Sequence, residues 1–267
     1  MEEKPRGVQI PVEKEGRRVG TEVVRSEEQS EQAGPELSIV IPIYNEEENI
    51  PPLLGAISRV MQEVGLSYEV ICVDDGSTDK SYAVLREMAD HYPGLVLIRF
   101  QENAGQTAAL DAGFKAARGR IIVTMDADLQ NDPADIPVLL EALQEYDMVC
   151  GWRYQRQDPW IKLVSARIAN AVRNWITQEQ IRDTGCSLKA YRRECLASLK
   201  LFTGMHRFLP TLVKMEGFRV TEVKVRHHPR RHGKSKYNIR NRLVSSFLDC
   251  LAVAWMQKRA LRYKIVE

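Results

Sequence analysis

The sequence predicts an α/β protein with a Rossmann-like, doubly wound and mostly parallel sheet that carries helices on both faces. Two observations support this fold class. Apolar, β-branched runs such as LSIVIPIY (37–44) alternate with segments of helical length and spacing. Polar or acidic residues directly follow three of these runs. In an open sheet of this kind, ligands bind beyond the carboxyl ends of the strands.

The expected elements follow one another along the chain. After the strand at 37–44, a helix is expected from about residue 47 to 64, with Pro51 and Pro52 tolerated in its first turn. Further strands are expected in the apolar runs YEVICVDD, LVLIRF, RIIVTMDAD and DMVCGWR, and helices in the segments between them. Beyond Arg153 the rhythm changes: WIKLVSARIANAVRNWI has helical spacing, TGCSLKAYRREC runs from strand to helix, and FRVTEVKVRHH alternates like a half-buried strand.

The 267 residues predict one domain with a segment on each side. Residues 1–36 contain nine glutamates, six basic residues and no aromatic residue, so we expect a disordered charged tail. The domain spans 37–237. Residues 238–267 are predicted to form an amphipathic helix.

Composition narrows the class of protein. Five scattered cysteines without a C-x-x-C pair indicate reduced, mostly buried thiols. No secretory signal or transmembrane span is expected, because every apolar run is too short. The net charge of +2 is uninformative, and no nucleic-acid partner is predicted. Basic residues are concentrated between Glu222 and Asp249, which favours either a solvated face or an anionic ligand.

The acids at the strand ends suggest the chemistry. Asp74 and Asp75 follow one predicted strand, while Asp126 and Asp128 follow another. The chain lacks G-x-G-x-x-G after its first strand and lacks a P-loop, which weakens a dinucleotide enzyme and a P-loop phosphotransferase. Paired carboxylates are suited to Mg²⁺ or Mn²⁺ carrying a diphosphate, and Gln130 is a candidate third ligand.

Several stretches together resemble the inverting family 2 glycosyltransferases of GT-A fold. They are IVIPIYNEEENI, VDDGSTD, ENAGQTAALDAGFKAARGRIIVTMDADLQNDP and GWR. With RDTGCSLKAYRRE, HRFLP and RRHGKSKYN added, the chain is most similar to the polyprenyl-phosphate branch, which includes dolichyl-phosphate mannose synthase. The likeness covers about residues 37–263.

The resemblance implies a role for each matching position. The nucleotide of a nucleotide-diphosphate sugar would contact Pro42, Tyr44, Asn45, Glu46, Asp74, Asp75 and Asp126. The metal would be held by Asp126, Asp128 and Gln130. The phosphates of donor and lipid acceptor would be gripped by Arg153, Lys162, Ser165, Arg230, Ser235 and Lys236. Asp183 would lie near the acceptor and, with Asp126, Asp128 and Arg153, would complete the catalytic set.

Acceptor chemistry separates the leading hypothesis from its alternatives. A phosphate monoester has a second pKa of about 6, so polyprenyl phosphate is already a nucleophile at neutral pH. A saccharide hydroxyl would need a general base, for which Asp183 is the candidate. A non-catalytic nucleotide-sugar sensor is the third possibility, although the intact set of acids argues against it.

Membrane contact is the last expectation. Apolar residues recur at helical spacing from Leu243 to Trp255, and basic residues flank them. This pattern predicts either a helix on an anionic lipid surface or one that packs on its own domain. The first choice implies a cytoplasmic protein, peripheral on the cytosolic face of a membrane, with a possible integral-membrane partner.

Overall fold

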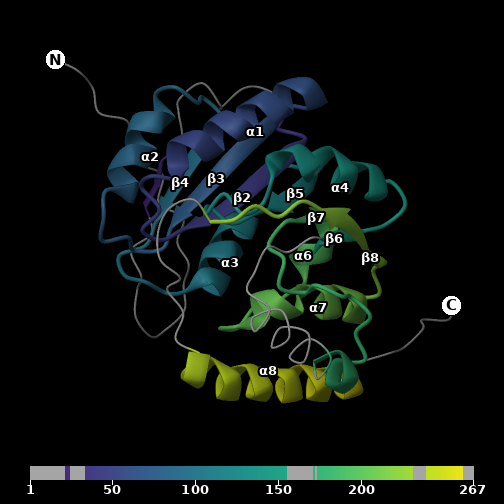
Figure 1. Ribbon diagram of the computed structural model, residues 1–267. Coiled ribbons are helices and arrows are strands. Elements are labelled where there is room, and N and C mark those ends of the chain that lie inside the picture. The colour runs from purple at the N-terminus through teal and green to yellow at the C-terminus, as the bar shows by residue number, and fades with distance from the viewer. Residues whose placement is uncertain (1–21, 25–33, 155–170, 172, 231–238, 261–267) are drawn as a thin grey trace, which may run out of the picture.

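One mixed β-sheet forms the centre of the molecule (Figure 1). The computed structural model describes residues 22–24, 34–154, 171, 173–230 and 239–260. Its strands are adjacent in the order β1-β4-β3-β2-β5-β7-β6-β8. Their bounds are β1 (Glu22–Val24), β2 (Leu37–Ile43), β3 (Tyr68–Asp74), β4 (Leu95–Arg99), β5 (Ile121–Thr124), β6 (Met148–Arg153), β7 (Lys189–Arg192) and β8 (Val220–Val225).

The parallel part of the sheet brings three strand ends to one edge. β2 pairs in parallel with β3 and β5, and β3 pairs in parallel with β4. Their continuous apolar runs are buried, as expected for strands covered on both faces. β7 is antiparallel to both β5 and β6, while β8 is parallel to β6. The predicted doubly wound α/β fold is therefore confirmed, with β7 as an inserted antiparallel strand.

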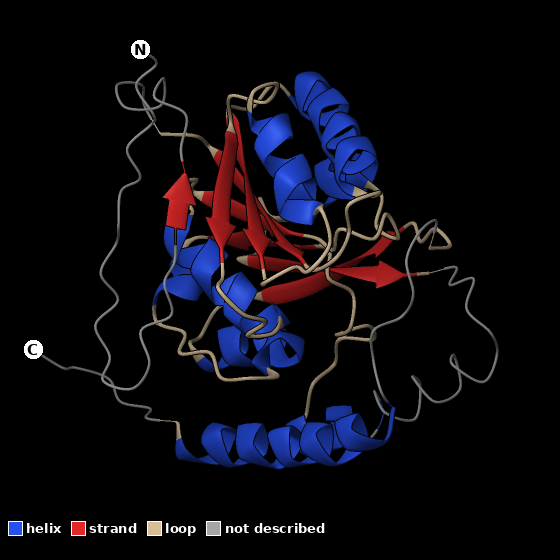
Figure 2. Cartoon of the chain, turned by 90° about the vertical axis from the view of Figure 1, so that its left-hand side faces the viewer, coloured by secondary structure: helices blue, strands red, loops and turns tan. Residues whose placement is uncertain are grey.

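Helices cover the two faces of the sheet (Figure 1, Figure 2). Helices α1, α2 and α4 lie on one face and α3, α6 and α7 on the other. Their bounds are α1 (Ile50–Val64), α2 (Ser81–Ala89), α3 (Gln106–Ala116), α4 (Ile136–Ala142), α6 (Glu194–Ala197) and α7 (Leu209–Met215), with short 3₁₀ turns η2 (Pro133–Asp135) and η3 (Met205–Phe208). Gly113 lets α3 approach β2 closely, since a Cβ there would lie 2.3 Å from Val40 Cγ1.

The amino-terminal segment differs from the prediction at one place. Residues 22–24 form β1, which pairs antiparallel with β4 along Leu97–Arg99, so disorder is not the state of these three residues. Backbone pairing on an open sheet edge can order a segment that buries few apolar side chains, a contribution that composition does not reveal. Most of the predicted helix at 160–176 lies outside the described residues.

The last helix, α8 (Ile239–Arg259), lies along the α7 side of the domain in both views (Figure 1, Figure 2). It packs on η3 and α7 through Cys250 and Val253, which share a cluster with Phe208. The prediction of a helix is confirmed. A single apolar stripe is not, because large apolar side chains also lie on the opposite, exposed side.

Candidate active site

The loops after β2 and β3 are joined by Asn45. Its Oδ1 accepts hydrogen bonds from the backbone N–H groups of Thr78 (2.7 Å) and Asp79 (3.3 Å), and its own N–H donates to Ser77 Oγ (2.9 Å). Its φ of 53° is a left-handed conformation that asparagine tolerates better than most residues. Asn45, a predicted nucleotide contact, therefore holds the loop after β3 against the loop after β2.

Asp74 is fully buried at the end of β3. One carboxylate oxygen accepts a hydrogen bond from Ser77 N–H (3.1 Å). The other lies 3.5 Å from Arg99 Nε and, among the described residues, has no hydrogen-bond partner. A buried carboxylate oxygen in this state can accept a further donor from a ligand. The half-buried Pro42 and Tyr44, also predicted nucleotide contacts, lie at the end of the adjacent strand β2.

Asp75 holds the turn that precedes α3. Its carboxylate accepts hydrogen bonds from Ala104 N–H (2.7 Å), Gly105 N–H (3.0 and 3.1 Å) and Asn103 Nδ2 (2.9 Å). Burial raises the pKa of Asp75, and the bonds from Ala104 and Gly105 counteract that effect. The sequence places Asp75 against the nucleotide, whereas the structure shows both of its oxygens engaged by the chain itself.

Gly76 allows this contact between the two loops. Its φ is +67°, and a Cβ there would lie 2.5 Å from the carbonyl carbon of Glu102. Any side chain would therefore push the turn of Asp75 away from the start of α3.

Asp126 and Asp128 follow β5, and each carboxylate is contacted from a different element. Gln106 Nε2 donates a hydrogen bond to Asp126 Oδ1 (2.8 Å). Arg230 Nη2 donates to Asp128 Oδ2 (2.6 Å), and Arg230 Nη1 lies 3.9 Å from Glu46 Oε1. The structure therefore brings acids from two strand ends around one guanidinium group, which is the meeting of acids and bases that the sequence predicts.

The backbone between the acids and Gln130 is strained. Leu129 has a φ of 60°, which is rare for a residue with a branched side chain. This conformation accompanies a hydrogen bond from Gln130 N–H to Asp128 Oδ1 (3.2 Å). Strain of this kind is common where a loop must present side chains to a ligand.

The surroundings of Asp128 disfavour its ionised form. Burial and repulsion from Asp126 raise the pKa of Asp128 to about 6, although Arg230 acts in the opposite direction. The Arg230 guanidinium group therefore does not fully offset the combined effect of burial and of the neighbouring Asp126. A divalent cation at this position would lower the electrostatic cost of ionising Asp128.

The basic stretch after β8 is anchored to the acidic loop by short contacts. His228 N–H donates to the carbonyl oxygen of Gln130 (3.0 Å). Arg226 Nε donates to Asp135 Oδ1 (2.9 Å), and Arg226 Nη1 lies 3.2 Å from Asp132 Oδ2. These pairs fix the end of β8 beside the loop and thereby direct Arg230 toward Asp128.

Arg153 and Asp183 form a buried, two-pronged ion pair. Arg153 Nε donates to Asp183 Oδ2 (2.7 Å), and Nη2 donates to Oδ1 (2.8 Å). Their side chains are only 16% and 6% exposed. Burial acts to lower the pKa of Arg153, but the hydrogen bonds and charge of Asp183 raise it above its ordinary value. Two of the four predicted catalytic residues, Arg153 and Asp183, are therefore paired with each other.

Four predicted phosphate contacts cannot be placed. Lys162, Ser165, Ser235 and Lys236 lie outside the described residues.

Two amide side chains at the site, Gln106 and Asn131, were not predicted from the sequence. The Asn131 side-chain oxygen accepts hydrogen bonds from Asp126 N–H (3.4 Å) and Ser187 Oγ (2.7 Å). Only the folded loops reveal that Gln106 contacts the carboxylate of Asp126 and that Asn131 contacts its backbone N–H.

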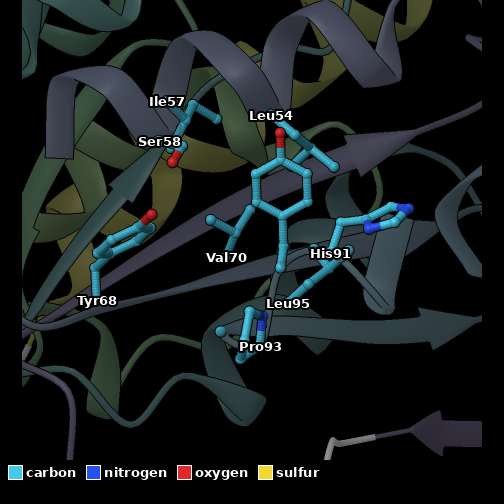
Figure 3. A pocket seen from close by; sticks show the side chains of 10 residues that line it. Leu54, Ile57, Ser58, Tyr68, Val70, His91, Pro93 and Leu95 are labelled. Carbon is cyan, nitrogen blue, oxygen red and sulfur yellow. The ribbon is translucent and has the colours of Figure 1, made fainter. Parts of the chain in front are cut away.

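A separate pocket of about 160 Å³ lies near the amino-terminal ends of β3 and β4, opposite the strand ends that carry the acids (Figure 3). Tyr68 and Leu95, which line it, begin β3 and β4, whereas the acids follow strand ends. Its remaining lining is formed by Leu54, Ile57, Ser58, Val70, His91, Tyr92, Pro93 and Gly94. This mostly apolar pocket has no basic side chain other than His91 and does not suit a diphosphate.

The order of the strands in the sheet, with acids and arginines at their carboxyl ends, is that of the GT-A fold. Solved structures support this fold. The chain superposes on glucosyl-3-phosphoglycerate synthase from Mycobacterium tuberculosis with a TM-score of 0.62 and 20% identity, covering 86% of this chain and 82% of that one. A mannosyltransferase from Pyrobaculum calidifontis, solved with GDP-Man and Mn²⁺, gives 0.61 and 21%, covering 87% and 66%.

The chain belongs to glycosyl transferase family 2, whose profile matches residues 38–199. A dodecaprenyl-phosphate galacturonate synthase from Rhizobium johnstonii is 42% identical over 86% of this chain and 68% of its own length. An undecaprenyl-phosphate 4-deoxy-4-formamido-L-arabinose transferase from Aeromonas hydrophila is 37% identical over 80% and 67%. The predicted family and branch are confirmed by these relatives.

Proposed function

We propose that this protein transfers a sugar from a nucleotide-diphosphate sugar to the phosphate of a polyprenyl phosphate. The relatives named above act on polyprenyl phosphates, which supports the acceptor class. The observation that carries the choice of acceptor is the ion pair between Arg153 and Asp183. The candidate general base has both oxygens engaged by a guanidinium fork, so it is poorly placed to accept a proton from a hydroxyl group.

A phosphate acceptor removes the need for that base. A phosphate oxygen of the acceptor would attack the anomeric carbon as the bond from that carbon to the donor diphosphate breaks, inverting the anomeric centre. The nucleoside diphosphate would leave with the electron pair. The protein's task is to hold two anions together. Arg230 contacts Asp128 at 2.6 Å, and the charge of Asp126 contributes to the raised pKa of Arg153.

The site also fits a divalent cation, Mg²⁺ or Mn²⁺. Asp126 and Asp128 would hold it with the side-chain oxygen of Gln130. Within the described residues no group of three or more His, Cys, Asp or Glu side chains forms a metal cage. A sparse protein shell is typical of Mg²⁺ bound together with substrate phosphates and water. When bound, the ion would neutralise the donor diphosphate and stabilise the departing nucleoside diphosphate.

The donor pocket would be formed by the ends of β2 and β3. We propose that Asp74 contacts the base or ribose through the oxygen that has no hydrogen-bond partner among the described residues, with Pro42 and Tyr44 beside it. Glu46 belongs to the acid group that faces Arg230. The sugar and the base are not specified by these contacts.

We further propose that α8 contacts a membrane surface. In the described part of the chain, no helix is long and apolar enough to cross a bilayer. The side of α8 away from the domain carries Phe247, Leu248, Leu251 and Trp255, each 46–63% exposed. Large apolar and aromatic side chains with basic neighbours suit the interface of an anionic membrane. A peripheral position on the cytosolic face, with or without an integral-membrane partner, follows from this proposal.

Liposome flotation tests the membrane contact. Replacing Phe247, Leu251 and Trp255 with serine is expected to abolish co-flotation with anionic liposomes. Val138→Ser is the matched control, since Val138 is 43% exposed on α4. Equal flotation of the triple variant and the wild type would contradict the assignment of α8.

Donor and acceptor are tested together in one assay. The protein is incubated with Mn²⁺ or Mg²⁺, polyprenyl phosphate and a panel of nucleotide sugars, and released nucleoside diphosphate is measured. Release that depends on the lipid phosphate supports the proposal, and Asp128→Ala should abolish it. Release that requires a saccharide acceptor instead would favour the hydroxyl-acceptor alternative.

A further inference from the structure

Gln106 contacts Asp126 with its side chain and follows a turn that is held by Asp75. Its amide donates a hydrogen bond to Asp126 Oδ1 (2.8 Å). Gln106 is the first residue of α3, directly after Gly105, which has a φ of +91°. Its position therefore depends on the turn that starts this helix.

Asp75 determines that turn. Its carboxylate accepts the N–H groups of Ala104 and Gly105 and the amide of Asn103. Gly113 fixes the other end of α3 against Val40 on β2. The start of α3 is thus held by Asp75 and its body by the sheet, so Gln106 has little freedom to move away from Asp126.

We propose that Gln106 is a positioning residue of the cation and donor site, and that Asp75 acts on the site only through Gln106. This inference rests on the proposed function, since it assumes that Asp126 binds the metal–donor complex. Under this inference Asp75 does not make the nucleotide contact that the sequence predicts, but holds the turn that positions Gln106.

The physical reason lies in the two oxygens of Asp126. Gln106 occupies Oδ1, and Asn131 accepts the backbone N–H of Asp126 (3.4 Å), so both the side chain and the backbone are oriented. Among the described residues, no hydrogen bond to Oδ2 is found, which leaves that oxygen for a cation. A ligand oriented in advance binds a metal more tightly, and loss of such an outer contact typically costs 10- to 100-fold in metal affinity.

Binding of Mn²⁺ alone, measured by electron paramagnetic resonance, tests the inference. Gln106→Ala is expected to weaken Mn²⁺ binding about tenfold with no large change in thermal stability. Gln106→Met keeps the length and removes the donor, and it should behave alike. Gln144→Ala, at an exposed glutamine just after α4, is the matched control and should bind Mn²⁺ as the wild type does.

A double-mutant cycle tests the role of Asp75. Asp75→Asn should weaken Mn²⁺ binding in the wild-type background but have little further effect on Gln106→Ala. Additive losses would overturn the route through Gln106, and unchanged Mn²⁺ binding by both Gln106 variants would overturn the inference as a whole. Asp128→Ala distinguishes failure of this inference from failure of the proposed metal site. If Asp128→Ala binds Mn²⁺ as well as the wild type does, the proposed metal site is wrong.

Discussion

Replacing Asp128 with asparagine is expected to stabilise the protein in the absence of divalent metal. Burial and repulsion from Asp126 raise the pKa of Asp128 from 3.8 to about 6, even with Arg230 beside it. At pH 7 the folded protein therefore carries an ionised group that it holds less favourably than the unfolded chain does. The separation between the two pKa values corresponds to about 3 kcal/mol, an upper figure for the gain from a neutral amide.

The destabilisation caused by ionised Asp128 is expected to depend on pH. A folded-state pKa above the unfolded one means that the destabilisation is fully present above about pH 6 and absent below the ordinary pKa near 4. Urea denaturation in EDTA should thus show Asp128→Asn more stable than the wild type at pH 7, with the difference lost near pH 3.5.

Asp132 provides a control of opposite sign. Burial acts to raise its pKa, but hydrogen bonds with Ala134 and His228 and the charge of Arg226 lower it overall. Asp132→Asn should therefore destabilise the protein at pH 7. If Asp128→Asn destabilises it to a similar degree, the acids do not carry an uncompensated charge and the reasoning for a cation site fails.

Three further predictions follow from individual contacts. Arg230→Met should raise the affinity for Mn²⁺ about tenfold at pH 8 without nucleotide, because Arg230 contacts Asp128 at 2.6 Å and competes with the ion; weaker binding in a Mn²⁺ titration would refute this. Arg153→Met and Asp183→Leu should each lower the free energy of unfolding by about 3–5 kcal/mol, with a smaller loss in the double variant; additive losses in urea denaturation would show that the pair is not coupled. Gly76→Ala should cost at least about 2 kcal/mol, since the new Cβ meets Glu102 backbone, and an unchanged melting temperature would contradict that contact.

Much of the fold could be predicted from local patterns. The run LSIVIPIY predicts β2, and the apolar spacing of 47–64 predicts α1, because both depend mainly on the burial of their own side chains. The strand β1 was missed because its order depends on backbone pairing with β4, which composition does not report. The antiparallel direction of β7 depends on its two neighbours and is likewise absent from its own residues.

The motifs predicted where the candidate site lies better than they predicted which donor contacts each carboxylate. Arg230 contacts Asp128, and Asp126 is near enough to raise the pKa of Asp128, because strand ends meet at one edge of a parallel sheet. The roles of Asp75 and Asp183 depend on which donors contact their carboxylates, and those donors lie 28–30 residues away in sequence. A single sequence does not reveal such partners.

The choice of acceptor tests the central claim most directly. The rate of nucleoside diphosphate release is compared between a polyprenyl phosphate and the corresponding polyprenol, with the responding nucleotide sugar and Mn²⁺. The account predicts release with the phosphate alone, because the site offers cations for an anionic nucleophile and its candidate base, Asp183, has both oxygens engaged by Arg153. Comparable release with the free alcohol would contradict it.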